Sequence, residues 1–219
     1  MEEHPNARLL ALSDGVIAVA ITLLVLDIRL PEGFGRYSDA ELGAALLALW
    51  PRMLAYLLSF LVIGSFWINH RAKFRHIAKS DSGLIWINMV FLLTIGLVPF
   101  TTNLIAESGG TLSTAIYAGT MMVSGLSLVW LWGHARRNGL VAPDTPEEES
   151  RRQYMTVLLI SAVFGVSVPL SIAHADLAKY FWILIVPINF VLRLLAVRRW
   201  TRDHPGAPVP GRFGPRQED

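Results

Sequence analysis

The chain has 219 residues, of which 53% are hydrophobic and 16% charged, and its formal net charge is +2. Soluble domains carry roughly 25% charged residues, so this composition excludes an ordinary soluble protein. The absence of cysteine excludes disulfides, thiolate catalysis and cysteine-bound metals. Apolar runs of about twenty residues, long enough to cross a bilayer, predict an all-α polytopic membrane protein.

Hydropathy predicts six membrane-spanning helices in one domain over residues 1–202. The first follows an N-terminus without the basic region and cleavage site of a signal peptide, so we expect it to be retained. A capping-box pattern at Ser38 and Glu41 precedes the second, and Pro51 interrupts it near the membrane surface. Residues 203–219 are rich in proline and glycine and predict a disordered cytoplasmic tail. The predicted spans cover residues 9–28, 42–69, 84–105, 112–133, 154–173 and 177–197.

The distribution of lysine and arginine predicts the orientation, because these residues favour the cytoplasmic side of a membrane. With a cytoplasmic N-terminus, fifteen of the nineteen basic residues fall in segments predicted to be cytoplasmic. The other four are Arg29, Arg36, Arg52 and Lys179. We therefore expect a plasma membrane protein with both termini in the cytoplasm.

The first span, which reads RLLALSDGVIAVAITLLVLDIRLP from Arg8, carries polar residues within its apolar run. A carboxylate in a membrane costs at least ~2.5 kcal/mol on insertion scales, so Asp14 is expected to face protein or water. Trp67 and His70, at the end of the second span, lie near the same predicted cytoplasmic surface. They could bond to Ser13 or Asp14 and lock the two helices together, or His70 could relay or sense protons.

A second face of the first span is smooth and apolar. At about 100° per residue, Gly15, Val19, Thr22 and Leu26 form one narrow stripe, which Leu23 flanks. Glycine and threonine allow helices to approach closely, so the stripe by itself favours helix packing. The alternative is a pore surrounded by copies of this helix, with aliphatic rings that gate by dewetting and a threonine ring that replaces ion hydration.

These residues resemble the signature of the transmembrane protein 175 family of potassium channels. The resemblance lies in Arg8, the run Ser13-Asp14-Gly15-Val16, the segment from Ile21 to Leu26, and Trp67-x-x-His70. It implies a bacterial-type homotetramer with six helices per subunit, whose first helices surround a pore that is permeable to potassium. By position in the motif, the implied pore-lining and selectivity residues are Val19, Thr22, Leu23 and Leu26. The implied structural network is Arg8, Ser13, Asp14, Trp67 and His70.

Three positions depart from the family pattern. Leu12 replaces the usual phenylalanine, which predicts looser packing. Val19 stands where isoleucine or leucine is common, which predicts a slightly wider ring. Arg71 follows His70 where a second histidine is often found, so a two-histidine network is not expected.

The resemblance implies passive potassium flux, with K+, the lipid bilayer and further copies of the chain as partners, and with no cofactor, no resident metal and no nucleic acid. A proton-coupled transporter that uses Asp14 and His70 is the alternative. An enzyme is disfavoured, because membrane-embedded ionisable residues are nearly absent outside the first span. Asp27, near the predicted outer end, is expected to attract cations or to pair with Arg29 or Arg36.

Two other classes of transport protein find little support in the sequence. The run from Thr94 to Leu97 is the nearest match to the TVGYG filter of conventional potassium channels, and it lacks the remaining residues. The polar residues of the first span and the prolines of the later spans do not recur in matching halves, which argues against an inverted-repeat transporter.

Overall fold

The computed structural model describes residues 6–29, 38–143, 145, 147–183 and 201–202. These residues form helices and no strand, apart from one isolated bridge between Ile77 and Val141, which confirms the all-α prediction. The elements are α1 (Ala7–Leu23), the 3-10 helix η1 (Leu24–Asp27), α2 (Asp39–Ala48), α3 (Trp50–Phe74), α4 (Ser82–Ser108), α5 (Thr111–Arg137), α6 (Glu147–Ala173) and α7 (Ala175–Ile183).

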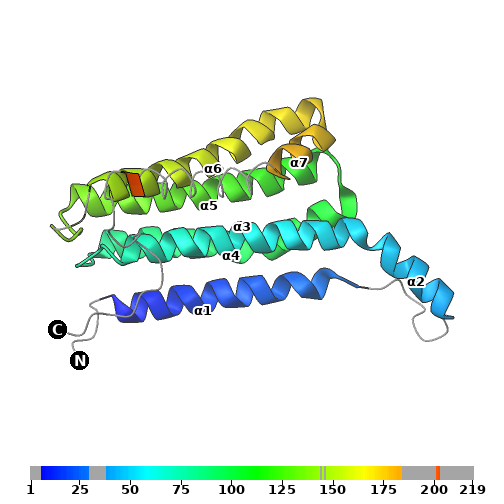
Figure 1. Cartoon of the computed structure of the whole chain (residues 1–219), viewed down its shortest axis with the longest axis horizontal. Helices are drawn as coiled ribbons and strands as arrows, with labels where there is room; N and C mark the ends of the chain where they lie inside the picture. Colours follow the sequence, from blue (N-terminus) through cyan, green and yellow to red (C-terminus); the bar gives the residue numbers. More distant parts are fainter. Residues whose placement is uncertain (1–5, 30–37, 144, 146, 184–200, 203–219) are drawn as a thin grey trace.

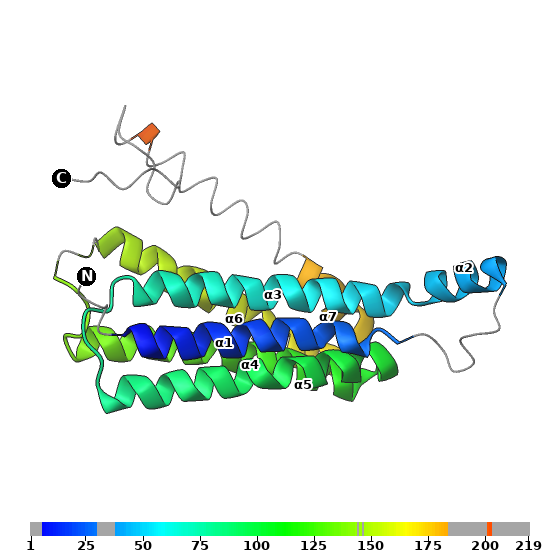
Figure 2. The same cartoon turned by 90° about the horizontal axis from the view of Figure 1, so that it is seen from below.

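Five long helices lie side by side in a bundle (Figures 1 and 2), with α1 along one edge and α2 continuing past one end. Each contains a segment long and apolar enough to cross a membrane. The sixth predicted span, 177–197, begins within α7, and most of it lies outside the described residues. The five candidate spans are Ala7–Asp27, Trp50–Phe74, Ser82–Ser108, Thr111–Arg137 and Tyr154–Ala173.

The stretch predicted as one span over residues 42–69 is instead two helices, α2 and α3. The capping box that opens α2 is present as predicted: the backbone N–H of Ser38 donates to Glu41 Oε2 at 2.8 Å, and Ser38 Oγ accepts from the Glu41 N–H. Pro51 lies in the first turn of α3, where a missing N–H leaves no helical hydrogen bond unmade. The proline therefore starts a new helix, and the membrane-crossing segment begins at Trp50 and runs to Phe74.

The ends of α4 are fixed by specific contacts. Asp81 caps its start by accepting from the Leu84 N–H at 2.7 Å. Its end turns at Gly109, whose φ of 56° lies in the left-handed region that favours glycine. Lys179 Nζ donates to the Gly109 carbonyl at 2.5 Å, which joins α7 to this end of α4.

The interior of the bundle is mostly apolar, with one buried hydroxyl cluster between three helices. Ser59 on α3 lies 2.8 Å from Thr102 Oγ1 on α4 and 3.0 Å from the Tyr117 hydroxyl on α5. All three side chains are buried. Because the bilayer core supplies no water, polar groups at this depth must bond to one another, and the cluster fixes the relative positions of α3, α4 and α5.

Candidate functional site

α1 has one face packed on the bundle and one face open. Ser13, Ile17, Ala20 and Leu24 are buried, and on a helical projection they lie roughly opposite the predicted stripe. Among the stripe residues and their flank, Val19 is 56% exposed, Leu26 60% and Leu23 42%, and Thr22 is also exposed. No described part of the chain covers this face.

Thr22 presents its oxygen to the open face. Its hydroxyl donates to the Val19 carbonyl of the preceding turn at 2.9 Å. Since the hydroxyl proton is used in this bond, the oxygen lone pairs remain available to a ligand outside the helix. The stripe therefore combines exposed aliphatic side chains with one outward acceptor.

The outer end of α1 departs from the geometry assumed in the sequence analysis. Residues Leu24–Asp27 form a 3-10 helix, in which each residue turns the chain by about 120° instead of 100°. Across this turn Leu26 is rotated by about 40° relative to a continuous α-helix. The rotation carries Leu26 toward Leu23, and both side chains stay on the open face.

The polar face of α1 contacts α3 directly through one strong hydrogen bond. Trp67 Nε1 donates to Asp14 Oδ1 at 2.7 Å, and both side chains are half-buried. The Arg71 guanidinium lies over the Trp67 ring, with Cζ 5.5 Å from its centroid. Asp14 on α1 is therefore bonded to an indole whose ring contacts Arg71, one turn further along α3.

A second chain of hydrogen bonds, buried except at its end on α1, runs from α3 through α4 to α1. His70 Nε2 lies 2.8 Å from Asn88 Oδ1, Asn88 Nδ2 donates to Ser13 Oγ at 3.0 Å, and Ser13 donates to the Leu9 carbonyl at 2.8 Å. The amide oxygen of Asn88 can only accept a hydrogen bond, so His70 Nε2 carries the proton and donates it to Asn88 Oδ1. The ring of His70 is stacked on Phe91 at 5.2 Å between centroids, which fixes its plane.

The structure brings together four of the five residues predicted to form the structural network. Asp14 and Trp67 form one contact, and Ser13 and His70 belong to the second chain. Arg8 is exposed, and no hydrogen bond or ion pair joins it to this group among the described residues. His70 reaches α1 only through an amide, so Asp14 and His70 do not bond to each other.

Asn88 is a member of this network that was not predicted from the sequence. It lies in a span without charged residues, where an amide is easily passed over. One signal was available: Asn88 lies near the start of its span, at the depth of Ser13 on α1 and of His70 on α3. A buried amide at the depth of two other polar groups on neighbouring spans predicts a shared hydrogen-bond network.

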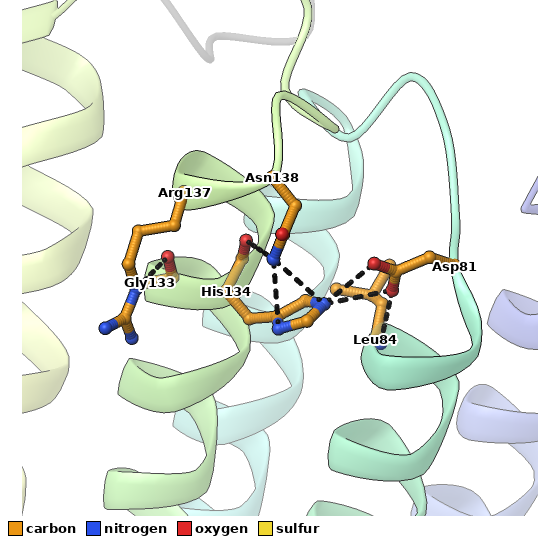
Figure 3. A network of polar contacts seen from close by, with 6 residues as sticks. All are labelled: Asp81, Leu84, Gly133, His134, Arg137 and Asn138. Carbon is orange, nitrogen blue, oxygen red and sulfur yellow. Dashed lines mark hydrogen bonds and ion pairs between the residues drawn. The ribbon is translucent and has the colours of Figure 1, made fainter.

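A second polar cluster, also missed, joins the start of α4 to the end of α5. Figure 3 shows the His134 imidazole pointing toward Asp81, with Nε2 lying 2.9 and 3.0 Å from the two carboxylate oxygens. Asn138 lies beside the ring and donates to the His134 carbonyl at 3.0 Å. The Leu84 N–H, and next the His134 side chain, hold the pKa of Asp81 below its usual range.

Gly83 leaves the space that the His134 ring occupies beside Asp81. A Cβ at position 83 would lie 2.6 Å from His134 Cε1, far inside ordinary contact distance. The cluster therefore ties the first turn of α4 to the last turn of α5, and it leaves the open face of α1 untouched.

The helices and their polar contacts define a multi-pass helical membrane protein, and comparison with known proteins places it in a family. The family model for the endosomal/lysosomal potassium channel TMEM175 matches residues 8–99. A potassium channel of Streptomyces collinus is 36% identical over 200 residues, which cover 84% of this chain and 95% of that protein. The chain belongs to the TMEM175 family, which confirms the resemblance seen in the sequence.

A solved relative has the same fold over nearly its whole length. The crystal structure of a lysosomal potassium-selective channel TMEM175 homolog from Chamaesiphon minutus matches with a TM-score of 0.74 and 30% sequence identity. The match covers 87% of this chain and 98% of that one. The human endosomal/lysosomal proton channel TMEM175 is 37% identical over 103 residues, which are 45% of this chain and 20% of the human protein.

Proposed function

We propose that this protein is a channel that conducts potassium passively through a pore lined by α1. The observation that carries the proposal is the open face of α1, because an apolar helix edge with one outward hydroxyl is unused within a single chain. Bacterial relatives of similar length are named potassium channels, and the solved relative from Chamaesiphon minutus is described as potassium-selective.

The proposed pore consists of rings contributed by equivalent residues of several copies. Val19, Leu23 and Leu26 would form aliphatic rings narrow enough to control hydration of the pore. Thr22 would form a ring of hydroxyl oxygens that replace part of the hydration shell of K+, since its proton already bonds to Val19. The proposal includes no cofactor and no enzymatic step.

We further propose a homotetramer in the plasma membrane with both termini in the cytoplasm. The described helices support this orientation, because α1, α4 and α6 begin at the same end of the bundle where α3 and α5 finish (Figures 1 and 2). Most of the described basic side chains lie at that end, and Arg29, Arg52 and Lys179 lie at the other. An excess of lysine and arginine marks the cytoplasmic side.

In this proposal Asp14 and His70 anchor the pore helix and do not carry protons. The two side chains bond to Trp67 and to Asn88 respectively, and both contacts fix α1 against its neighbours. Proton permeation is the second candidate, because the human relative is named a proton channel. A proton-coupled carrier that uses Asp14 and His70 is the third, and it predicts coupled flux that Asp14→Asn abolishes in a stable protein.

The test is potassium flux into liposomes that contain the purified protein and variants of the open face. We expect Leu26→Ala and Thr22→Ala to change the rate or the ion preference of potassium flux severalfold, because each alters a proposed ring. Leu93→Ala is the matched control, since Leu93 on α4 is 65% exposed, close to the 60% of Leu26. Flux that responds equally to Leu93→Ala and Leu26→Ala would contradict a pore on α1.

A further inference from the structure

A pocket of about 530 Å³ lies at the outer end of the bundle, where α1, α3 and α4 meet. Its apolar lining includes Leu23, Leu26 and Phe100. Its charged lining residues are Asp27 and Arg29 from the end of α1, Arg52 from the start of α3 and Glu107 from the end of α4. The pocket therefore gathers charges of both signs beside apolar side chains.

These four charges do not pair with one another. Among the described residues, Asp27 and Glu107 accept no side-chain hydrogen bond and form no ion pair. Arg29 Nε donates to the Leu26 carbonyl at 3.2 Å, and Arg52 Nη1 donates to the Arg29 carbonyl at 3.4 Å. Both guanidinium groups keep further donors that point at no described acceptor, so the pocket retains unused donors and unused carboxylates together.

An apolar groove continues from this pocket along α1 and α4. A second hollow of about 470 Å³ shares Leu23 with the first and is lined by Leu12, Gly15, Val16 and Val19 of α1 and by Gly96 of α4. A Cβ added at Gly15 or Gly96 would meet nothing within 4 Å, so the groove is open at both glycines. Its lining includes Val19 and Leu23 of the open face, and the groove extends from these residues to α4.

We propose that this groove is the docking surface for α1 of a neighbouring copy of the chain, held at its outer end by two ion pairs. The neighbouring copy brings a carboxylate and a guanidinium two residues apart, Asp27 and Arg29. Its Arg29 pairs with Glu107, and its Asp27 pairs with Arg52. The proposal rests on the proposed homotetramer and assigns the surfaces through which its subunits meet.

Charge complementarity selects the second copy as the occupant. The end of α1 carries one negative and one positive residue, Asp27 and Arg29. On the pocket wall, Arg52 of α3 and Glu107 of α4 carry the complementary positive and negative charges. The apolar side chains of the incoming α1 would pack in the apolar groove. The two open glycines of the groove, Gly15 and Gly96, permit close approach of the helix backbones. Each subunit of a ring would give one α1 end and receive one, so every charge in the pocket would be paired.

The first experiment reverses the charges singly and together in the full chain. We expect Arg29→Glu and Glu107→Arg each to raise, by roughly tenfold or more, the concentration at which half of the chains are assembled in detergent. The double variant Arg29→Glu with Glu107→Arg should restore wild-type assembly, because the pair is re-formed with its signs exchanged. Asp39→Arg, on the exposed helix α2, controls for the change in net charge.

The second experiment uses the absence of cysteine in the chain. Arg29→Cys and Glu107→Cys chains, carrying different tags, are mixed and oxidised. We expect a disulfide between the two tagged chains, whereas Arg29→Cys mixed with Lys79→Cys should give none, because residue 79 lies at the opposite end of the bundle.

Unchanged assembly of both single-reversal variants, or a double variant no better than the worse single one, would overturn the proposal. Recovery of the single variants by added phosphatidylethanolamine, without the disulfide between chains, would assign the pocket to a zwitterionic lipid headgroup and would likewise overturn it. The proposed function fails separately: if the Arg29→Cys and Glu107→Cys chains form the expected disulfide and the wild-type protein conducts no potassium, the proposed interface is supported and the proposed channel is not.

Discussion

Single residues at the N-terminal end of α1 connect this helix to two others through buried polar contacts. Asp14 receives the Trp67 indole N–H, and Ser13 receives the Asn88 amide, which in turn accepts from His70. Ser13, His70 and Asn88 are fully buried. Since a buried polar group left without a partner costs about 1–3 kcal/mol, these contacts hold α1 in one position.

Asn88 should be the most sensitive residue of this group. Asn88→Leu removes the acceptor of His70 and the donor to Ser13 at once, so we expect a loss of about 2–4 kcal/mol of stability. The measurement is thermal unfolding of the purified protein in detergent. Asn69→Leu is the control, because Asn69 Nδ2 donates only to the Ser65 carbonyl of its own helix. Equal losses in the two variants would contradict a network that joins three helices.

The sequence predicted four residues of these contacts, Ser13, Asp14, Trp67 and His70, but not Asn88. The polar pattern of the first span and Trp67-x-x-His70 predicted that α1 and α3 meet at one depth, and Trp67 and Asp14 do bond. The sequence did not show that α4 lies between His70 and Ser13. That fact depends on which helices are neighbours, which hydropathy does not encode. The Asp81–His134 contact was missed for the same reason, because the two residues are 53 positions apart and on different helices.

Among the helices, α5 and α6 pack closely through small residues. A Cβ at Gly125 would lie 3.2 Å from Ser161 Cβ, and Ser161 is buried and bonded to the Val157 carbonyl at 2.8 Å. Small residues at such positions let membrane helices approach each other. The contact therefore depends on the absence of a side chain at position 125.

Substitutions of two glycines in α5 should have opposite effects. Gly125→Ala forces α5 and α6 apart and should cost about 1–3 kcal/mol. Gly119→Ala meets nothing within 4 Å and should stabilise the helix by about 0.5–1 kcal/mol. Thermal unfolding of the two variants in the same detergent measures both effects, and a stability loss at Gly119 equal to that at Gly125 would contradict the packing described.

The start of α4 should respond to acid. The depressed pKa of Asp81 means that its carboxylate stabilises the fold above the unfolded value of about 4, and that this contribution is lost as pH falls through the lower folded value. Asp81→Asn keeps a capping side chain and removes the charge. We expect the variant to be less stable than wild type near neutral pH and the difference to shrink as the pH falls below about 4.

The measurement is the apparent Tm of both proteins across this pH range. Asp39→Asn serves as the control, since Asp39 is exposed on α2 and bonds to no other helix. A difference between wild type and Asp81→Asn that does not change with pH would show that the charge of Asp81 is not responsible.

Element boundaries followed from the sequence where local chemistry sets them. The Ser38–Glu41 capping box opens α2 as predicted, because both partners lie within one turn. The predicted second span was too long at its start, because hydropathy does not distinguish one apolar helix from two. Pro51 was the local signal for a break, and it begins α3.

Taken whole, the molecule is a bundle with one helix edge left open. α1 lies along that edge, with buried residues toward α3 and α4 and its apolar stripe uncovered. In the proposed assembly around α1, neighbouring copies would cover this edge and occupy the adjoining charged pocket. The number of copies follows from no property of one chain, so the sequence supplies it only through the family resemblance.

The most direct test of the proposed function is potassium flux through the wild-type protein in liposomes under a potassium gradient alone. A passive channel predicts flux without an imposed proton gradient, and a membrane potential that follows the potassium gradient. Potassium flux that occurs only when a proton gradient is imposed would contradict the channel and point to a carrier that involves Asp14 and His70.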